Sequence, residues 1–298
     1  MRLLQAASAE AWIFNSTIRR HDMDGTSPLT EQINPRFEQM DTLDTESIMY
    51  MINDEDAKVA SAVRKAIPNA AMVAEKAACG IAKGGRLIYV GAGTSGRIGV
   101  LDASECPPTF GVSHETVQGH IAGGYGALIR AAEGAEDDAG EGMKLIDGLG
   151  VTAYDTVIGI SASGGAAYVI AAVDRAREKG AYTAALTSNQ GTRLGAAADT
   201  EIAVITGPEA VAGSTRMKCA TAQKLVLNMI STSVMVKLGR VRGALMTDMV
   251  ATNQKLRQRA VRIVMSAAGA DEHKALEALE KCAMDTGKAI KLLESNNE

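Results

Sequence analysis

The sequence predicts an α/β protein with a doubly wound, parallel five-stranded sheet flanked by N- and C-terminal helices. Short apolar runs alternate with helical patterns between residues 86 and 206, as in proteins whose parallel sheet is covered on both faces. A glycine-rich turn follows the first run, where such sheets bind ligands. The 298 residues are 46% hydrophobic and 22% charged, which is ordinary for a globular protein.

Helices are expected before the sheet. Residues 1–28 carry no clear periodicity and predict a loose arm or, in their first part, a short helix. Thr45 can begin one helix and Asn53 a second, whose apolar residues recur on one face. Pro68 is expected to end that second helix, because proline removes a backbone donor and clashes with the preceding turn. A third helix then covers about 70–82.

Five apolar runs predict the strands, and longer periodic segments predict the helices between them. The expected strands are 86–91, 116–122, 155–161, 182–187 and 201–206, and the expected helices are about 96–104, 126–146, 165–179 and 190–197. Because ligands bind beyond the carboxyl ends of parallel strands, the loops after the first and third strands are expected to meet at one ligand.

The rest of the chain is expected to be helical. A helix at about 220–237 carries a broad apolar stripe, which suits either core packing or a contact with another subunit, and a helical pattern returns from about Gly243. We therefore divide the chain into an N-terminal arm with helices at 1–69, a central α/β domain at 70–242 and a C-terminal helical segment at 243–298.

The turn from Gly91 to Arg97 predicts an anion site. It joins a strand to a helix N-terminus, where backbone N–H groups and the helix dipole favour negative charge. Thr94 and Ser95 add hydroxyl donors, and Arg97 adds positive charge. The glycines match G-x-G-x-x-G, but the carboxylate expected about 20 residues later for a dinucleotide is absent. A small phosphate ester is the favoured ligand, and an ordinary glycine turn is the alternative.

Two further loops offer hydroxyl groups. Ser161-Ala-Ser-Gly-Gly165 follows the third strand, and Ser214-Thr-Arg-Met-Lys218 precedes the helix at 220–237. The second of these loops is either a third cluster of hydroxyls and cations at the ligand or an ordinary helix cap with solvated basic residues. The predicted phosphate-binding residues are Gly93, Thr94, Ser95, Arg97, Ser161, Ser163, Gly164 and Ser214.

Composition excludes several classes of protein. A net charge of −4 and an aromatic content of 3% argue against a nucleic-acid partner. The four cysteines and four histidines are dispersed, so neither a metal site nor a disulfide framework is expected. No stretch approaches the ~18 apolar residues of a membrane span, and the first residues lack the apolar region of a signal peptide. We expect a cytoplasmic protein without a membrane partner.

Two acidic segments contain candidate acid/base groups. Glu105 lies about two turns after the glycine turn, at the end of a helix that Pro107 and Pro108 are expected to stop. Glu133 and Glu136 are expected one helical turn apart. A solvated helix face is the alternative for these glutamates.

The run Leu87–Gly111, which includes GAGTSGR and DASECPP, closely resembles the N-acetylmuramic acid 6-phosphate etherases, a family of the sugar-isomerase (SIS) fold. The resemblance extends over roughly residues 28–270. The other segments that carry it are Thr30–Gln32, Ile52–Asp56, Ile121–Gly124, Glu133–Asp137, Gly213–Lys218, Thr221–Met229 and Val250–Asn253.

The resemblance implies that residues 70–242 form an SIS domain that binds a sugar phosphate. It implies a lyase that cleaves the D-lactyl ether of N-acetylmuramic acid 6-phosphate to N-acetylglucosamine 6-phosphate and D-lactate, by elimination and hydration, without a metal or redox cofactor. The family's two essential glutamates match Glu105 and Glu136. Glu105 is expected to act at the ether oxygen and Glu136 near C2. A homodimer with sites near the subunit interface is also implied.

The second loop departs from the family. SIS domains usually have Ser-Gly-x-Thr there, often Ser-Gly-Arg-Thr-Pro-Tyr, whereas this chain has Ser163-Gly-Gly165-Ala166-Ala-Tyr168. A lost hydrogen bond to a charged ligand costs about 1.5–3 kcal/mol. The departure motivates one alternative, a non-catalytic regulator that binds a sugar phosphate. A phosphosugar isomerase is a third hypothesis, which the Ser-Glu-Cys-Pro-Pro run disfavours.

Overall fold

The computed structural model describes residues 27–249 and 254–295. It confirms the parallel five-stranded sheet, whose strand order is β2-β1-β3-β4-β5. The strands are β1 Leu87–Gly91, β2 Val117–Ile121, β3 Thr156–Ile160, β4 Tyr182–Thr187 and β5 Thr200–Ala203. Most of the expected N-terminal arm and the segment 250–253 lie outside the described residues.

Two neighbouring interior strands, β1 and β3, explain where ligands can bind. Every residue of β1 and β3 is buried, as expected for continuous apolar runs covered on both faces. Gly91 pairs with Ile160 on one side and with Ile121 on the other, so β1, β2 and β3 end level with one another. The loops after β1 and β3 therefore start side by side at one edge of the sheet.

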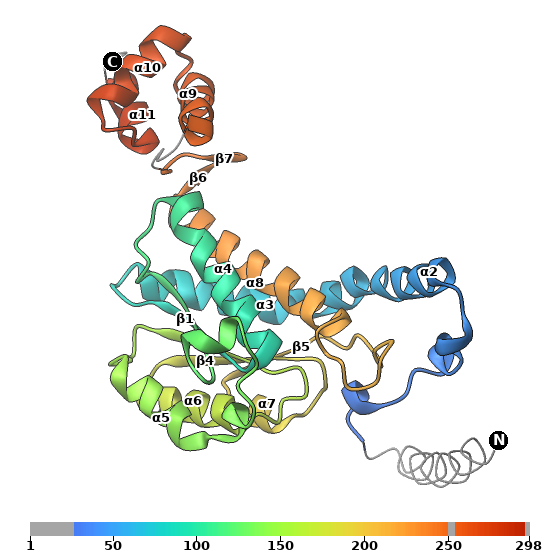
Figure 1. Ribbon diagram of the computed structural model, residues 1–298. Coiled ribbons are helices and arrows are strands. Elements are labelled where there is room, and N and C mark those ends of the chain that lie inside the picture. Colours follow the sequence, from blue (N-terminus) through green and yellow to red (C-terminus); the bar gives the residue numbers. More distant parts are fainter. Residues whose placement is uncertain (1–26, 250–253, 296–298) are drawn as a thin grey trace, which may run out of the picture.

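Helices cover both faces of the sheet (Figure 1). Helices α3, α4 and α8 form one apolar core with the strands, and α5, α6 and α7 form the other. The bounds are α3 Val59–Ile81, α4 Gly93–Phe110, α5 Ala139–Gly148, α6 Ala167–Glu178, α7 Arg193–Ala197 and α8 Lys218–Lys237. The doubly wound arrangement predicted from the sequence is thus present.

The prediction for the N-terminal helices was wrong at two points. Helix α2 spans Thr45–Asp56, begins after an Asp44 cap and includes the residues from Asn53 that were expected to start a new helix. Helix α3 continues through Pro68 and across the proposed boundary at residue 69. Pro68 lies on the exposed face, while the opposite face packs in the core both before and after it, which outweighs the lost hydrogen bond.

The expected helix at 126–146 was wrong in its first part, because α5 begins only at Ala139. Two short 3-10 turns, η4 Tyr125–Leu128 and η5 Ala135–Asp137, precede α5, and Gly134 between them adopts the left-handed conformation. Glu133 and Glu136 therefore do not share a helical turn. In contrast, α4 is longer than expected, since it continues past Pro107 and Pro108 and ends at the left-handed Gly111.

The C-terminal segment packs around a core of its own (Figure 1). It begins with a hairpin of β6 Val241–Arg242 and β7 Leu245–Met246, where a helix was expected, and continues with α9 Gln254–Ala268, α10 Glu272–Lys281 and α11 Thr286–Ser295. The N-terminal segment carries the 3-10 turns η1 Leu29–Glu31, η2 Pro35–Phe37 and η3 Met40–Thr42. Within residues 27–249 and 254–295, no helix combines the length and apolar character that a membrane span needs.

Candidate active site

A cavity of about 230 Å³ lies where β1 and β3 end. Its walls come from four segments of the central domain and from the N-terminal segment. The lining residues are Glu31, Ala92, Gly93, Thr94, Ser95, Glu136, Ile160, Ser161, Ala162, Ser163, Ala166, Gly213 and Thr215.

The first wall is the N-terminus of α4. Ala92 precedes the helix in an extended conformation, and its side chain caps no backbone N–H group. Gly93 has a φ of 53°, a left-handed conformation that glycine adopts without strain, and it turns the chain from strand into helix. The first N–H groups of α4 and the hydroxyls of Thr94 and Ser95 thus border the cavity, as an anion site requires.

The second wall is the loop after β3. The Ser161 hydroxyl oxygen accepts a hydrogen bond from the Gly164 N–H at 3.2 Å, and the Ser163 hydroxyl oxygen accepts one from the Gly165 N–H at 3.2 Å. Both hydroxyls keep their own proton for a ligand. Ala166 precedes α6, provides no side-chain cap and lines the cavity at the position where the resemblance implied threonine.

Several predicted site residues lie elsewhere. The Arg97 guanidinium donates to the carbonyl oxygens of Leu128 at 3.1 Å and Ala127 at 2.7 Å, so it supports the η4 loop and does not line the cavity. Gly164 does not line the cavity; its N–H group donates to the Ser161 hydroxyl oxygen within the second loop. Ser214 is also absent from the lining, although its neighbour Thr215 belongs to it.

The two candidate catalytic glutamates are separated. Glu136, in η5, lines the cavity. Glu105 is exposed near the far end of α4 and does not line it. At 1.5 Å per residue, Glu105 lies about 18 Å along the helix from Gly93. The cavity of one chain therefore contains one of the two predicted acid/base groups.

Sequence reasoning missed Glu31 and Thr215. Glu31 belongs to a polar, turn-like segment without any strand-loop-helix pattern, and it reaches the cavity only through tertiary contacts. The resemblance at Thr30–Gln32 was the available signal. Thr215 stood in a predicted cluster, but its neighbour Ser214 was chosen.

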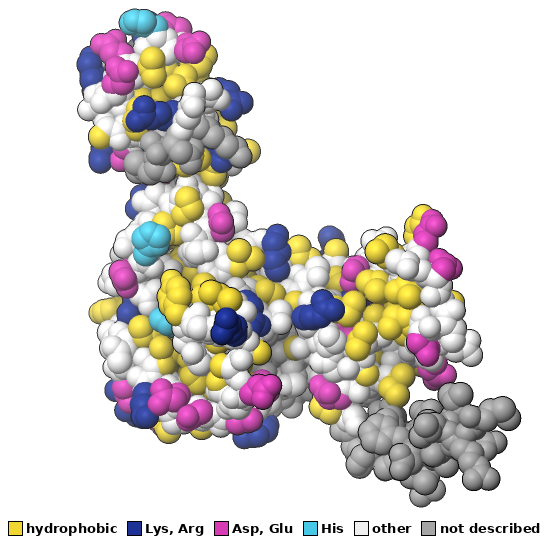
Figure 2. Space-filling view, in the orientation of Figure 1, with side chains coloured by type: hydrophobic (Ala, Val, Ile, Leu, Met, Phe, Trp, Pro, Cys, Tyr) yellow, Lys and Arg dark blue, Asp and Glu magenta, His cyan; other side chains and the backbone are white. Residues whose placement is uncertain are grey.

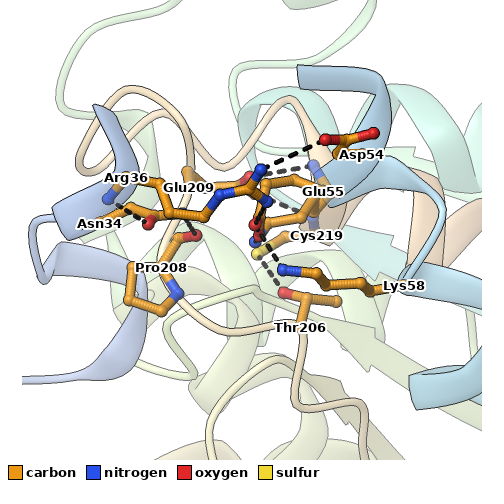
Figure 3. A network of polar contacts seen from close by, with 10 residues as sticks. Asn34, Arg36, Asp54, Glu55, Lys58, Thr206, Pro208, Glu209 and Cys219 are labelled. Atoms are coloured by element: carbon orange, nitrogen blue, oxygen red, sulfur yellow. Dashed lines mark hydrogen bonds and ion pairs between the residues drawn. The ribbon is translucent and has the colours of Figure 1, made fainter. Parts of the chain in front are cut away.

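The basic end of that cluster is structural. Lys218 is 2% exposed, and its ammonium donates to Glu55 of α2 at 2.8 Å. Arg36 and Lys58 also bind the Glu55 carboxylate (Figure 3). Burial opposes ionisation of Glu55, but hydrogen bonds from Lys218, Lys58 and Arg36 outweigh it and lower its pKa to about 2. Lys218 is therefore neither a ligand-binding cation nor a solvated one.

Glu209 closes the N-terminus of α8. Its fully buried carboxylate accepts hydrogen bonds from the N–H groups of Lys218 at 3.1 Å and Cys219 at 2.9 Å (Figure 3). An internal anion thus occupies the position that a ligand would take at an open helix end. Among the described residues, no group of three or more His, Cys, Asp or Glu side chains could hold a metal ion.

The parallel sheet, with a cavity at its carboxyl edge, has the architecture of an SIS-domain protein. The SIS domain family matches residues 148–233, and the glucokinase regulatory protein N-terminal SIS domain matches residues 67–177. The chain belongs to the N-acetylmuramic acid 6-phosphate etherase family. It is 51% identical over 265 residues to such etherases of Yersinia pestis (strain Pestoides F) and Yersinia pseudotuberculosis (serotype O:1b), covering 89% of this chain and 90% of each relative.

Among solved structures, a phosphoheptose isomerase from Francisella tularensis is 19% identical with a TM-score of 0.47. The match covers 63% of this chain and 98% of that one.

Proposed function

We propose that this protein is an N-acetylmuramic acid 6-phosphate etherase, a carbon–oxygen lyase that yields N-acetylglucosamine 6-phosphate and D-lactate. The observation that carries the proposal is the 51% identity to etherases over 89% of the chain. The cavity supports it, because hydroxyl donors and an acid/base carboxylate border one small space. The family's cytoplasmic location is proposed with it.

The phosphate is proposed to bind between the N-termini of α4 and α6. Neither helix has a side-chain cap, so both leave N–H groups and a positive dipole end for an anion. Thr94, Ser95, Ser161 and Ser163 can add hydroxyl hydrogen bonds. No lysine or arginine is among the residues that line this cavity, so neutral donors are expected to hold the phosphate.

The carboxylates are proposed to move protons. In the open-chain sugar, the C2 proton is acidic because it lies next to the C1 aldehyde. Glu136 removes that proton, the C3–O bond breaks, and the ether oxygen takes a proton from Glu105 as lactate leaves. Glu105 then takes a proton from water, whose oxygen adds to C3, and a proton returns to C2. The proposed chemistry requires no metal or redox cofactor.

Glu105 is proposed to act in the cavity of a second copy. Its exposed position about 18 Å along α4 supports this arrangement, because the cavity of its own chain lies at the opposite end of the helix. Apolar side chains lie exposed on the projecting N-terminal part of the chain (Figure 2), and Met49 and Tyr50 of α2 are both 65% exposed. Such surfaces are typical of protein interfaces. A homodimer would complete both sites.

D-Lactate release from N-acetylmuramic acid 6-phosphate tests the proposal. The parent should release lactate, and Glu105→Gln and Glu136→Gln should each lose activity by about 10²-fold or more. A co-refolded equal mixture of the two variants should recover about a quarter of the parent activity, because half of the dimers are mixed and each has one complete site. A parent that releases no lactate contradicts the etherase. A mixture that stays inactive contradicts the shared site.

A regulator that binds a sugar phosphate without turning it over is the alternative. Ala166 favours it, because the cavity lacks a hydroxyl there. Glu136 in the cavity and the identity to etherases argue for the enzyme. Binding of N-acetylglucosamine 6-phosphate without any lactate release would support the regulator.

A further inference from the structure

The N-terminal segment contributes a carboxylate to the cavity. Glu31 ends η1 and lines the cavity beside the loops of the central domain. Its carboxylate has no hydrogen-bond or ion-pair partner among residues 27–249 and 254–295, in contrast to the carboxylates of Glu55 and Glu209. A carboxylate without a partner at a ligand cavity is available to the ligand.

Hydrogen bonds join the segment around Glu31 to neighbouring loops on two sides of the cavity. The Leu29 N–H donates to the Asn189 side-chain oxygen at 2.8 Å, and the Asn189 amide donates to the Ala162 carbonyl at 3.1 Å. On the other side, the Gly213 N–H donates to the Thr30 carbonyl at 3.0 Å. Thr30 is 1% exposed. These hydrogen bonds hold the segment of Glu31 between the loop before α8 and Asn189, which in turn bonds the loop after β3.

The backbone at Gly213 leaves space for Glu31. A Cβ atom on Gly213 would lie 3.1 Å from a Glu31 carboxylate oxygen, closer than most real Cβ contacts, and the φ of Gly213 is 74°. Glycine meets both requirements at no steric cost. The position of the Glu31 carboxylate therefore depends on its own segment and on Gly213, which is distant in sequence.

The charge of the cavity limits what Glu31 can bind. Its lining contains two carboxylates, Glu31 and Glu136, and no lysine or arginine. Glu31 repels a phosphate, so the phosphate is placed at the helix N-termini and Glu31 faces another part of the ligand. An ionised carboxylate accepts hydrogen bonds and donates none. The neutral donors of an amino sugar are its hydroxyl and amide groups.

We infer that Glu31 is a specificity-determining residue that accepts a hydrogen bond from a hydroxyl or amide N–H group of the sugar. The inference rests on the proposed sugar-phosphate site and adds a residue to it. Glu31 selects for the sugar and adds no favourable contribution to the affinity for phosphate alone.

Calorimetric binding of two probes tests the inference. Glu31→Ala should weaken binding of N-acetylglucosamine 6-phosphate tenfold or more, the change that corresponds to loss of one charged hydrogen bond. Glu31→Gln keeps a neutral acceptor and should weaken it less. Binding of inorganic phosphate should stay equal or become tighter in both variants. Glu38→Gln, an exposed change seven residues away on the same segment, should alter neither affinity.

Two results would overturn the inference. Equal losses for both probes would mean that Glu31 only supports the cavity, and unchanged sugar-phosphate binding would mean that it makes no contact. The midpoint of thermal unfolding should stay unchanged, since the carboxylate has no partner among the described residues to lose. Failure of the etherase proposal would look different: the parent would bind N-acetylglucosamine 6-phosphate but release no lactate from N-acetylmuramic acid 6-phosphate.

Discussion

Helices α4 and α8 both begin at loops that border the cavity, yet their first turns are used in opposite ways. At α8, the buried Glu209 carboxylate binds two backbone N–H groups, and Lys218 pairs with Glu55. At α4, no side chain caps the helix, and Gly93, Thr94 and Ser95 line the cavity. The N-terminus of α8 binds a carboxylate of the protein itself, and the N-terminus of α4 is where we propose that the ligand's phosphate binds.

The difference shows that hydroxyl and basic residues near a helix N-terminus do not identify a ligand site by themselves. Both helix ends have such residues, with Arg97 near the start of α4 and Lys218 as the first residue of α8. In both cases the cation is engaged within the protein, by carbonyl oxygens or by a carboxylate. What separates the two ends is whether a buried acidic residue occupies the anion position.

The largest expected effect is on stability and comes from breaking the buried ion pair between Lys218, at the start of α8, and Glu55. Glu55→Gln leaves Lys218 buried without its counter-charge, and removing one partner of a buried pair costs about 3–5 kcal/mol. The free energy of unfolding in urea should fall by that amount. Asp54→Asn is the matched control, because its pair with Arg36 is exposed and should contribute at most about 1 kcal/mol. Equal effects of the two changes would contradict a structural role for the buried pair.

The pH dependence of the unfolding free energy should reveal the contribution of the Glu55–Lys218 ion pair. The folded-state pKa of Glu55 is about 2, below the ordinary value of 4.5. A lowered pKa stabilises the fold above pH 4.5, and the stabilisation is lost as the pH falls through about 2. The shift corresponds to roughly 3 kcal/mol. The difference in unfolding free energy between the parent and Glu55→Gln should shrink over that interval, and a constant difference would contradict the assignment.

At the uncapped N-terminus of α4, removal of a hydroxyl group should weaken ligand binding and leave the free energy of unfolding nearly unaltered. Ser95→Ala removes a donor at the cavity, so N-acetylglucosamine 6-phosphate should bind about tenfold more weakly. Ser104→Ala, on the exposed side of the same helix, should leave affinity unchanged. Calorimetry on both variants measures the contrast. Equal affinities would argue against a phosphate at α4.

The smallest expected effect is a gain at α6. Ala166→Thr supplies a cap where none exists and adds a hydroxyl to the cavity. A threonine cap contributes about 0.5–2 kcal/mol relative to alanine. Both the unfolding free energy and the affinity for N-acetylglucosamine 6-phosphate should rise. Weaker binding would show that the cavity is shaped around the smaller side chain.

The sequence predicted the sheet and the common edge of its strands well, and it predicted tertiary contacts poorly. Continuous apolar runs such as Leu87–Gly91 mark buried strands, so the five strands and their common edge followed from pattern alone. Pro68 was misjudged because packing on the opposite face of α3 maintains the helix. Glu31 reaches the cavity from a segment far along the chain, and Glu209 caps a helix that begins nine residues after it; no strand or helix pattern reveals either contact.

The most direct test of whether the uncapped N-terminus of α4 binds the phosphate compares lactate release from N-acetylmuramic acid 6-phosphate and from N-acetylmuramic acid. If the uncapped N-termini of α4 and α6 bind the phosphate, kcat/KM should be about a hundredfold or more higher for the phosphate ester, since several hydrogen bonds to a charged group are lost without it. Similar values of kcat/KM for the two sugars would contradict the account.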